Sequence, residues 1–139
     1  MQPQLKLRDV IIAMSASSNS GMNRLRFNGM DYAPTASYEL LKKAVAAAEA
    51  RGITVHVGNI LSSDTFYGDD PDAWKHWADY GVLAVEMEAA ALYTIAAKFK
   101  VNALAICTVS DSIVSHQAEP SEDREKAYTQ MFEIALELA

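Results

Sequence analysis

The sequence contains one cysteine, no long apolar run and no cluster of basic residues, and each absence excludes a class of protein. Cys107 has no second cysteine with which to form an intrachain disulfide or a metal cluster. No apolar stretch approaches the roughly 18 residues that a transmembrane helix needs, and the first residues lack the pattern of a signal peptide. The net charge of −6, without a basic run, argues against a nucleic-acid partner. We therefore expect a cytoplasmic protein that binds neither membranes nor nucleic acid.

Glycine is sparse as well, and its spacing excludes two common phosphate-binding loops. No two of the six glycines lie within four residues of each other, so neither a G-x-G-x-x-G turn nor a P-loop occurs. The three histidines lack metal-ligand spacing, and we expect no metal site. If the protein handles phosphate, we expect the loop that cradles it to lie outside this chain.

The composition that remains is typical of a folded globular domain. Half of the 139 residues are hydrophobic and 22% are charged, with no internal repeat and no low-complexity linker. A chain of this length is expected to bury roughly 68–70% of its unfolded surface. We therefore predict that residues 1–139 form a single domain.

Apolar strand patterns alternate with amphipathic helix patterns along the chain. Strands are predicted over residues 5–15, 54–61, 82–85 and 104–109, and helices over about residues 36–50, 71–80, 89–99 and from 121 onward. This alternation predicts an α/β fold with a mostly parallel sheet flanked by helices. The first strand is expected to form an unpaired edge of that sheet.

Three of the helices carry apolar stripes that are expected to face the core. The stripe in the helix over about residues 36–50 consists of Leu40, Leu41, Ala44, Val45 and Ala48. The stripe in the helix after Glu88 consists of Leu92, Ile95, Ala96 and Phe99. The stripe in the last helix consists of Tyr128, Met131, Phe132, Ala135 and Leu136.

Carboxylates follow two of the predicted strands. Residues 82–85 lead into Glu86-Met87-Glu88, and residues 104–109 lead into Ser110-Asp111. Two strands joined by one helix make a βαβ unit, and ligands bind outside the carboxyl ends of parallel strands. We therefore expect both acidic groups at one edge of the sheet.

Both acids also have ordinary structural interpretations. Glu88 could be an acid at a helix start, where the dipole contributes ~0.3–1 kcal/mol, and Asp111 could be a turn residue. Position alone does not decide whether Glu86 or Glu88 would contact a ligand. On the residue pattern alone, these alternatives stay open.

The segment VEMEAAALYTIAAKF, followed by NALAICTVSD, resembles the nucleoside phosphorylase superfamily, and within it the hexameric bacterial type of purine nucleoside phosphorylase. The likeness extends over LKLRDVIIAMSAS, MNRLRF and VGNILSSDTFY. It implies phosphorolysis of purine (deoxy)ribonucleosides to free base and (deoxy)ribose 1-phosphate, with phosphate as co-substrate and no cofactor. It also implies a homo-oligomer, a hexamer in this family. The chain resembles only the C-terminal portion of such an enzyme, so we expect the N-terminal phosphate-binding part to be lacking and the isolated chain to be inactive.

The resemblance implies a role for individual residues. Glu88 would bind the ribose hydroxyls, and Met87 would pack against the sugar. Asp111 would be the acid that faces N7 of the purine, and Arg124 would assist it. The other residues near the base would be Phe66, Val85, Glu86 and Ser110.

One position departs from the family pattern, and one requirement follows from the chemistry. Ser112 stands where the family usually has histidine, which we expect to alter the loop to Ser115 rather than the reaction. A free aspartate, with a reference pKa of about 3.9, is ionised at neutral pH. To donate a proton, Asp111 needs burial or an acceptor partner, and the apolar strand before it predicts burial.

Two other functions remain open. A nucleosidase that hydrolyses thioadenosine-type nucleosides would share VEMEAAA and the strand-end Ser-Asp, and would need no phosphate loop. The segments TVSDSI and LYTIAAKF favour the phosphorylase over it. The third alternative is a non-catalytic piece that binds nucleoside weakly or serves as an assembly unit.

Overall fold

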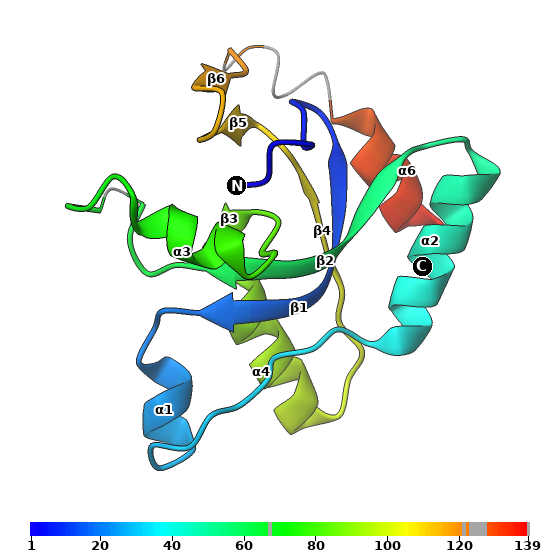
Figure 1. Cartoon of the computed structure of the whole chain (residues 1–139). Helices are drawn as coiled ribbons and strands as arrows, with labels where there is room; N and C mark the ends of the chain where they lie inside the picture. Colours follow the sequence, from blue (N-terminus) through cyan, green and yellow to red (C-terminus); the bar gives the residue numbers. More distant parts are fainter. Residues whose placement is uncertain (67, 121, 123–127, 139) are drawn as a thin grey trace.

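The computed structural model covers the whole chain and describes all residues except 67, 121, 123–127 and 139 (Figure 1). The strands are β1 (Val10–Ser18), β2 (Val55–Ser62), β3 (Val85–Glu86), β4 (Ala105–Thr108), β5 (Asp111–Ser112) and β6 (Gln117–Ala118). The helices are α1 (Met22–Arg26), α2 (Tyr38–Ala50), α3 (Ala73–Asp79), α4 (Ala89–Phe99) and α6 (Thr129–Leu136). The predicted α/β class is confirmed. Across the described residues, no helix has the length and apolar character needed to cross a membrane.

Among the residues that the structure describes, the main sheet has four strands, in the order β3-β2-β1-β4. β1 pairs in parallel with β2, and β2 pairs in parallel with β3, whereas β4 is antiparallel to β1. The sheet is therefore mostly parallel, as predicted. The prediction that the first strand forms an open edge is wrong, because β1 lies in the interior of the sheet. Its run of Val10, Ile11 and Ile12 is almost completely buried, which requires neighbours on both sides.

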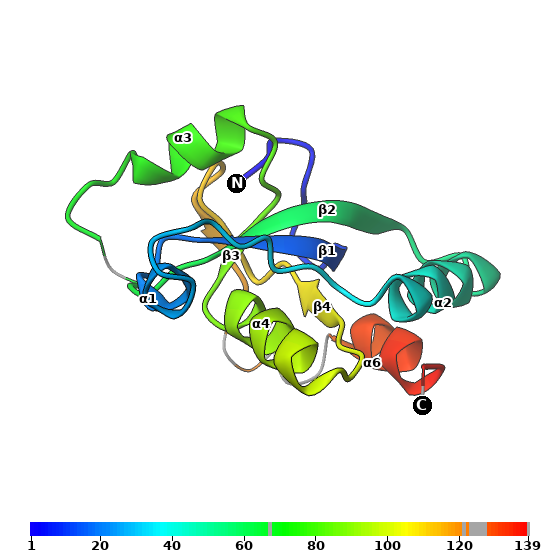
Figure 2. The same cartoon turned by 90° about the horizontal axis from the view of Figure 1, so that it is seen from below.

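The two faces of β1 pack against different helices. Ile11 and Ala13 pack in a cluster with α4, whereas Val10 and Ile12 pack against α2 and α6. The register of β1 against β2 shifts between Ala13 and Ser15, which marks a β-bulge. The bulge explains why Ala16, three residues after Ala13, faces the same cluster. Figure 1 shows β1 bending along its length, and Figure 2 shows α3 and α4 on opposite sides of β1 and β2.

α4 contacts the sheet through small residues rather than through its predicted stripe. Its buried residues are Ala89, Ala90, Tyr93, Thr94 and Ala96. The predicted inward positions Leu92, Ile95 and Phe99 are 44%, 46% and 67% exposed, so the prediction is wrong for these three. The alanines let the helix approach the strands closely, and Tyr93 fills the remaining volume.

Tyr93 also joins α4 to two strands. Its hydroxyl donates to the Ala13 carbonyl at 2.5 Å and accepts from the Ala105 amide at 2.9 Å, which bridges β1 and β4 beside the bulge. Burial raises the pKa of Tyr93 to about 12, so the phenol remains protonated and able to donate at neutral pH.

The core face of α6 also differs from the prediction. Ile134 is completely buried, while the predicted stripe residues Phe132 and Leu136 are exposed. The predicted start of this helix at Ser121 lies outside the described residues. In α2 the predicted stripe is confirmed, since Ala44 and Ala48 are buried against β1.

Candidate active site

The acidic segment after β3 begins with Glu86, whose carboxylate caps the start of α4. Its Oε2 accepts hydrogen bonds from the amides of Glu88 and Ala89 at 2.8 and 2.7 Å, and its Oε1 accepts one from Ser62. The Ser62 hydroxyl in turn accepts from the Ala90 amide at 2.8 Å. The first amides of a helix have no partner within the helix and carry the positive end of its dipole. Glu86 therefore has a structural task that engages both of its oxygens.

Glu88, two residues later, is in a different position. It is the N-cap residue of α4, but its side chain makes no capping hydrogen bond. It is exposed, and no hydrogen bond or ion pair to its carboxylate occurs among the described residues. Val85 and Met87, its neighbours on β3 and in the loop, are about two-fifths exposed. The carboxylate that a ligand can reach at this strand end is thus that of Glu88.

Asp111 does not share an edge with Glu88 in the way that the βαβ interpretation predicted. Because β4 is antiparallel to β1, Asp111 follows it near the start of β1, where Val109 donates to the Asp9 carbonyl at 2.9 Å. The prediction of a parallel unit is wrong because β3 and β4 lie at opposite edges of the sheet, with β2 and β1 between them. An alternating hydrophobic pattern carries no information about strand order or direction.

The curvature of the sheet nevertheless brings β4 close to the acidic segment. Burial raises the pKa of Cys107, the nearby carboxylates of Glu86 and Glu88 act in the same direction, and together these effects bring it to about 11. Cys107 lies in β4, four residues before Asp111. Cys107 also packs against the cluster that contains Ala89 and Ala90, so Glu88 and the strand that leads to Asp111 lie near the same region of the sheet.

Asp111 itself is exposed in this chain, so the predicted burial is wrong. Ser110, which is half-buried, donates from its hydroxyl to Asp111 Oδ2 at 2.5 Å. A short hydrogen bond of this kind orients the carboxyl group. Arg124, the predicted assistant, lies outside the described residues.

A small hairpin that the sequence did not predict positions Asp111. β5 pairs antiparallel with β6, which places Asp111 opposite Ala118. The amide of Ser115 donates to the Ser112 hydroxyl at 3.2 Å inside the turn. The hairpin then leads to Glu119, whose buried carboxylate forms a two-point ion pair with Arg8, at 2.9 and 3.1 Å. Strands of two residues have no periodicity that could have predicted them.

A network of short polar side chains lies at the carboxyl ends of β1 and β2, and the sequence interpretation missed it. Asn19 donates to the Ser63 hydroxyl at 2.9 Å and accepts from the Asp64 amide at 3.0 Å. The Ser63 hydroxyl donates a hydrogen bond to the Thr65 carbonyl at 3.0 Å. The next residue, Phe66, is 74% exposed. The serine-rich ends of both strands, SASSNS and LSSD, were the signal that could have identified this network.

Within the described part of the chain, no group of three or more His, Cys, Asp or Glu side chains is arranged to hold a metal ion. The candidate site consists of Glu88 with its apolar neighbours, the Ser110–Asp111 pair, and the Ser62–Glu86 network that fixes the start of α4.

Comparison with known proteins agrees with this geometry. The family model described as "Phosphorylase superfamily" matches residues 1–139. A protein of Thermoanaerobacter sp. (strain X514), named "Purine nucleoside phosphorylase DeoD-type", is 61% identical over all 139 residues, which cover 60% of its own length. Proteins with the same name from Caldanaerobacter subterraneus subsp. tengcongensis and Clostridium perfringens (strain SM101 / Type A) are 60% and 50% identical over the whole chain. The matched region is 60% of the length of the first of these proteins and 59% of the length of the second.

The chain thus spans about 60% of the length of the curated relatives it matches. The match of the family model extends over every described element, from the strands of the sheet to α6. The chain belongs to the phosphorylase superfamily.

Proposed function

We propose that this chain is part of a purine nucleoside phosphorylase, a pentosyltransferase that moves the (deoxy)ribosyl group of a purine nucleoside to phosphate. The observation that carries the proposal is the 61% identity to a relative named for this activity, over a match that spans the positions from Phe66 to Arg124. We further propose that residues 1–139 form a single domain, which is the C-terminal portion of a nucleoside phosphorylase domain.

Glu88 is proposed to hold the ribose. A carboxylate can accept one hydrogen bond at each oxygen, which suits two neighbouring hydroxyl groups. The exposed position of Glu88, beside half-exposed Met87 and Val85, supports this role, because the two apolar side chains offer a surface for the sugar and the base. Glu86 is assigned to the framework, since it binds the amides of Glu88 and Ala89.

Asp111 is proposed to protonate N7 of the purine as the glycosidic bond breaks. Negative charge develops on the leaving base, and a positioned general acid typically contributes about 10²–10⁴-fold to the rate. The hydrogen bond from Ser110 supports the role of Asp111, because it sets the direction in which the carboxyl group points. Arg124 would favour the anion, so we assign its action to the stage after proton transfer, and Phe66 is assigned to the base pocket.

Phosphate is proposed as the co-substrate, without a further cofactor. The sequence contains neither a G-x-G-x-x-G turn nor a P-loop, so we infer that the isolated chain is inactive and that phosphate-binding groups come from elsewhere in the assembled enzyme. A cytoplasmic homo-oligomer, hexameric as in the family it resembles, belongs to the same proposal.

The test is a chimera in which this chain replaces the matching part of the Thermoanaerobacter relative. We expect phosphate-dependent release of base from inosine or adenosine, and a loss of at least 100-fold in turnover for Asp111→Ala. Glu88→Gln should lower kcat/KM at least tenfold, whereas Glu49→Gln, an exposed glutamate on α2, serves as the matched control and should change nothing.

Three results would count against the proposal. Base release without phosphate would favour the nucleosidase. A folded chimera that binds nucleoside but releases no base would favour a non-catalytic piece. Equal activity of the Glu88→Gln and Glu49→Gln chimeras would remove Glu88 from the site.

A further inference from the structure

The strands β1, β2 and β3 are neighbours in the sheet, and their ends lie at the same level. In the register of the sheet, Ser18 of β1 is paired with Ser62 of β2, which is paired with Glu86 of β3. The loops after β2 and β3 carry the proposed base-pocket residue Phe66 and the acidic segment, whereas the loop after β1 begins with Asn19. Figure 1 shows the loops after β1 and β2 leaving the sheet at the same end. Asn19 therefore lies beside the start of the loop that leads to Phe66.

The side chain of Asn19 binds this loop with both ends of its amide group. Its Nδ2 donates to the Ser63 hydroxyl at 2.9 Å, and its Oδ1 accepts from the Asp64 amide at 3.0 Å. The backbone amide of Asn19 also donates to the Ser62 carbonyl at 3.4 Å, which continues the pairing of β1 with β2. A side-chain amide that donates at one end and accepts at the other fixes the orientation of both partners. Asn19 thus sets the direction in which the chain leaves β2.

Ser63 connects Asn19 to Phe66 on one side and to the acidic segment on the other. Its hydroxyl donates to the Thr65 carbonyl at 3.0 Å, one residue before Phe66. Its backbone amide donates to the Glu86 carbonyl at 2.8 Å. Ser63 is buried, and hydrogen bonds that are shielded from water are stronger than exposed ones. The loop after β2 cannot shift relative to the acidic segment without breaking them.

We propose that Asn19 is a positioning residue for nucleoside binding, which holds Phe66 in place relative to Glu88 through its hydrogen bonds to Ser63 and Asp64. Phe66 is 74% exposed, so it presents a surface that a purine ring can cover. A loop that is ordered before the ligand arrives does not lose that conformational entropy on binding, which raises affinity without altering the chemical step. The inference rests on the proposed function, because Phe66 and Glu88 are assigned to the nucleoside there.

The experiment introduces Asn19→Ala into the chimera with the Thermoanaerobacter relative and measures kcat and KM for inosine or adenosine. The variant loses the hydrogen bonds to Ser63 and Asp64 and none to Asp111. We therefore expect KM for the nucleoside to rise about fivefold or more, while kcat stays within about threefold and KM for phosphate within about twofold. Asn19→Asp keeps an acceptor for the Asp64 amide, so its KM should lie between those of the parent and Asn19→Ala.

Asn59→Ala is the matched control, because Asn59 joins the same two strands before their loops begin. Its side chain accepts from the Ser15 hydroxyl at 3.0 Å and from the Ser17 amide at 3.2 Å, and it donates to the Ser17 hydroxyl at 2.8 Å. Asn59→Ala should lower the free energy of unfolding at least as much as Asn19→Ala, and it should leave KM for the nucleoside within about twofold. The Asp64 amide should exchange with solvent about tenfold faster in Asn19→Ala and at the parent rate in Asn59→Ala.

The possible failures of this test are distinguishable. An unchanged KM for the nucleoside in Asn19→Ala would overturn the inference and leave the proposed function in place. A rise in KM that Asn59→Ala shares would also overturn it, because the effect would then come from general loosening of β1 against β2. A parent chimera without phosphate-dependent release of base would remove the proposed function, and this inference with it.

Discussion

Glu86 and Glu88 are separated by one residue, and the structure predicts opposite consequences for their removal. In Glu86→Ala, the amides of Glu88 and Ala89 and the Ser62 hydroxyl all lose their acceptor. A hydrogen bond to a charged group contributes about 1.5–3 kcal/mol, and loss of a helix cap costs about 0.5–2 kcal/mol. Part of this loss is recovered, since the Glu88 amide can bind water.

We therefore expect Glu86→Ala to lower the free energy of unfolding by about 2–4 kcal/mol, a large share of the roughly 5–15 kcal/mol typical of a domain. Glu86→Gln should cost less, because the amide oxygen still accepts from the helix amides. Glu88→Ala should cost under about 0.5 kcal/mol, as expected for an exposed side chain without a partner.

Urea unfolding at neutral pH measures these differences, provided that the slope of free energy against denaturant stays constant among the variants. Exchange of the Ala90 amide is a local measure, since this group donates to Ser62. Equal destabilisation by Glu86→Ala and Glu88→Ala would refute the division between a framework acid and a ligand-facing acid. So would a stable Glu86→Ala variant.

Two further predictions concern buried groups near the same region. Tyr93→Phe removes the hydroxyl that bridges Ala13 and Ala105, and the free energy of unfolding, measured by heat or urea, should fall by about 2 kcal/mol. An unchanged free energy of unfolding would mean that this bridge does not stabilise the contact between β1 and β4. The pKa of Cys107 is about 11 in the folded chain, against about 8.5 for an unfolded thiol. As the pH rises above about 8.5, the thiol of the unfolded chain ionises while that of the folded chain stays neutral. The free energy of unfolding should therefore fall between about pH 8.5 and pH 11. Alkylation of Cys107 at pH 8 should be at least 100-fold slower in the native than in the unfolded chain, and similar rates would contradict the raised pKa.

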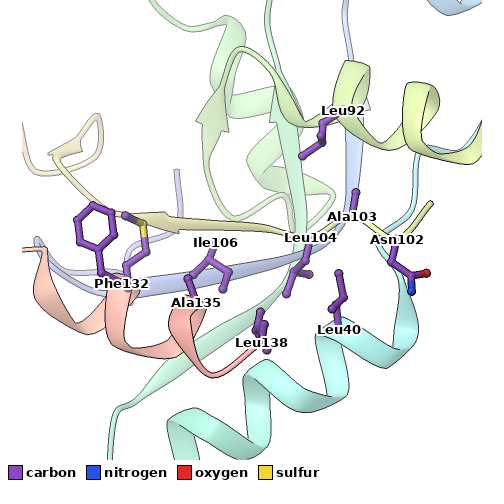
Figure 3. Close-up of a pocket in the computed structure, with 10 residues that line it drawn as sticks. Leu40, Leu92, Asn102, Ala103, Leu104, Ile106, Phe132, Ala135 and Leu138 are labelled. Carbon is purple, nitrogen blue, oxygen red and sulfur yellow. The ribbon is translucent and has the colours of Figure 1, made fainter. Parts of the chain in front are cut away.

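The sequence predicted the kinds of element well and their partners poorly. The run of apolar residues from Val10 indicated a buried strand, and Ala44 and Ala48 were correctly placed on the inner face of their helix. Strand order and direction, however, depend on contacts between distant segments, and the position and pairing of β4 could not be deduced from its own residues. The stripe of α4 illustrates a second limit, because Leu92 lines a pocket beside β4 with Leu104 and Ile106 (Figure 3), whereas Ile95 and Phe99 are exposed, so none of these three side chains faces the core.

The candidate site was likewise only partly predicted from the sequence. The resemblance singled out Glu88 over Glu86, and only the hydrogen bonds of Glu86 provide a physical reason for that choice. The Ser62 hydroxyl could not be identified from the sequence, since its importance comes from pairing with a residue 24 positions away. The hairpin that carries Asp111 was missed because its strands are too short to leave a pattern.

The sheet's curvature brings residues from its two edges close to each other. In a flat sheet, β3 and β4 would be separated by three strand spacings, or about 14 Å. In the register of the sheet, Glu86 corresponds to Ser18 of β1, whereas Cys107 corresponds to Ile11. The distance along the strand direction would therefore add about 20 Å. Charges at such a distance, beyond the Debye length of about 8–10 Å, would have little effect on a thiol. In the structure, Cys107 packs against the cluster that contains Ala89 and Ala90, and the carboxylates of Glu86 and Glu88 contribute to its raised pKa. The sheet is therefore not flat: β1, which lies between β2 and β4, shifts register between Ala13 and Ser15 and bends along its length (Figure 1). Straightening β1 at this point would therefore separate Glu88 from the strand that leads to Asp111, even if every residue of the site were kept.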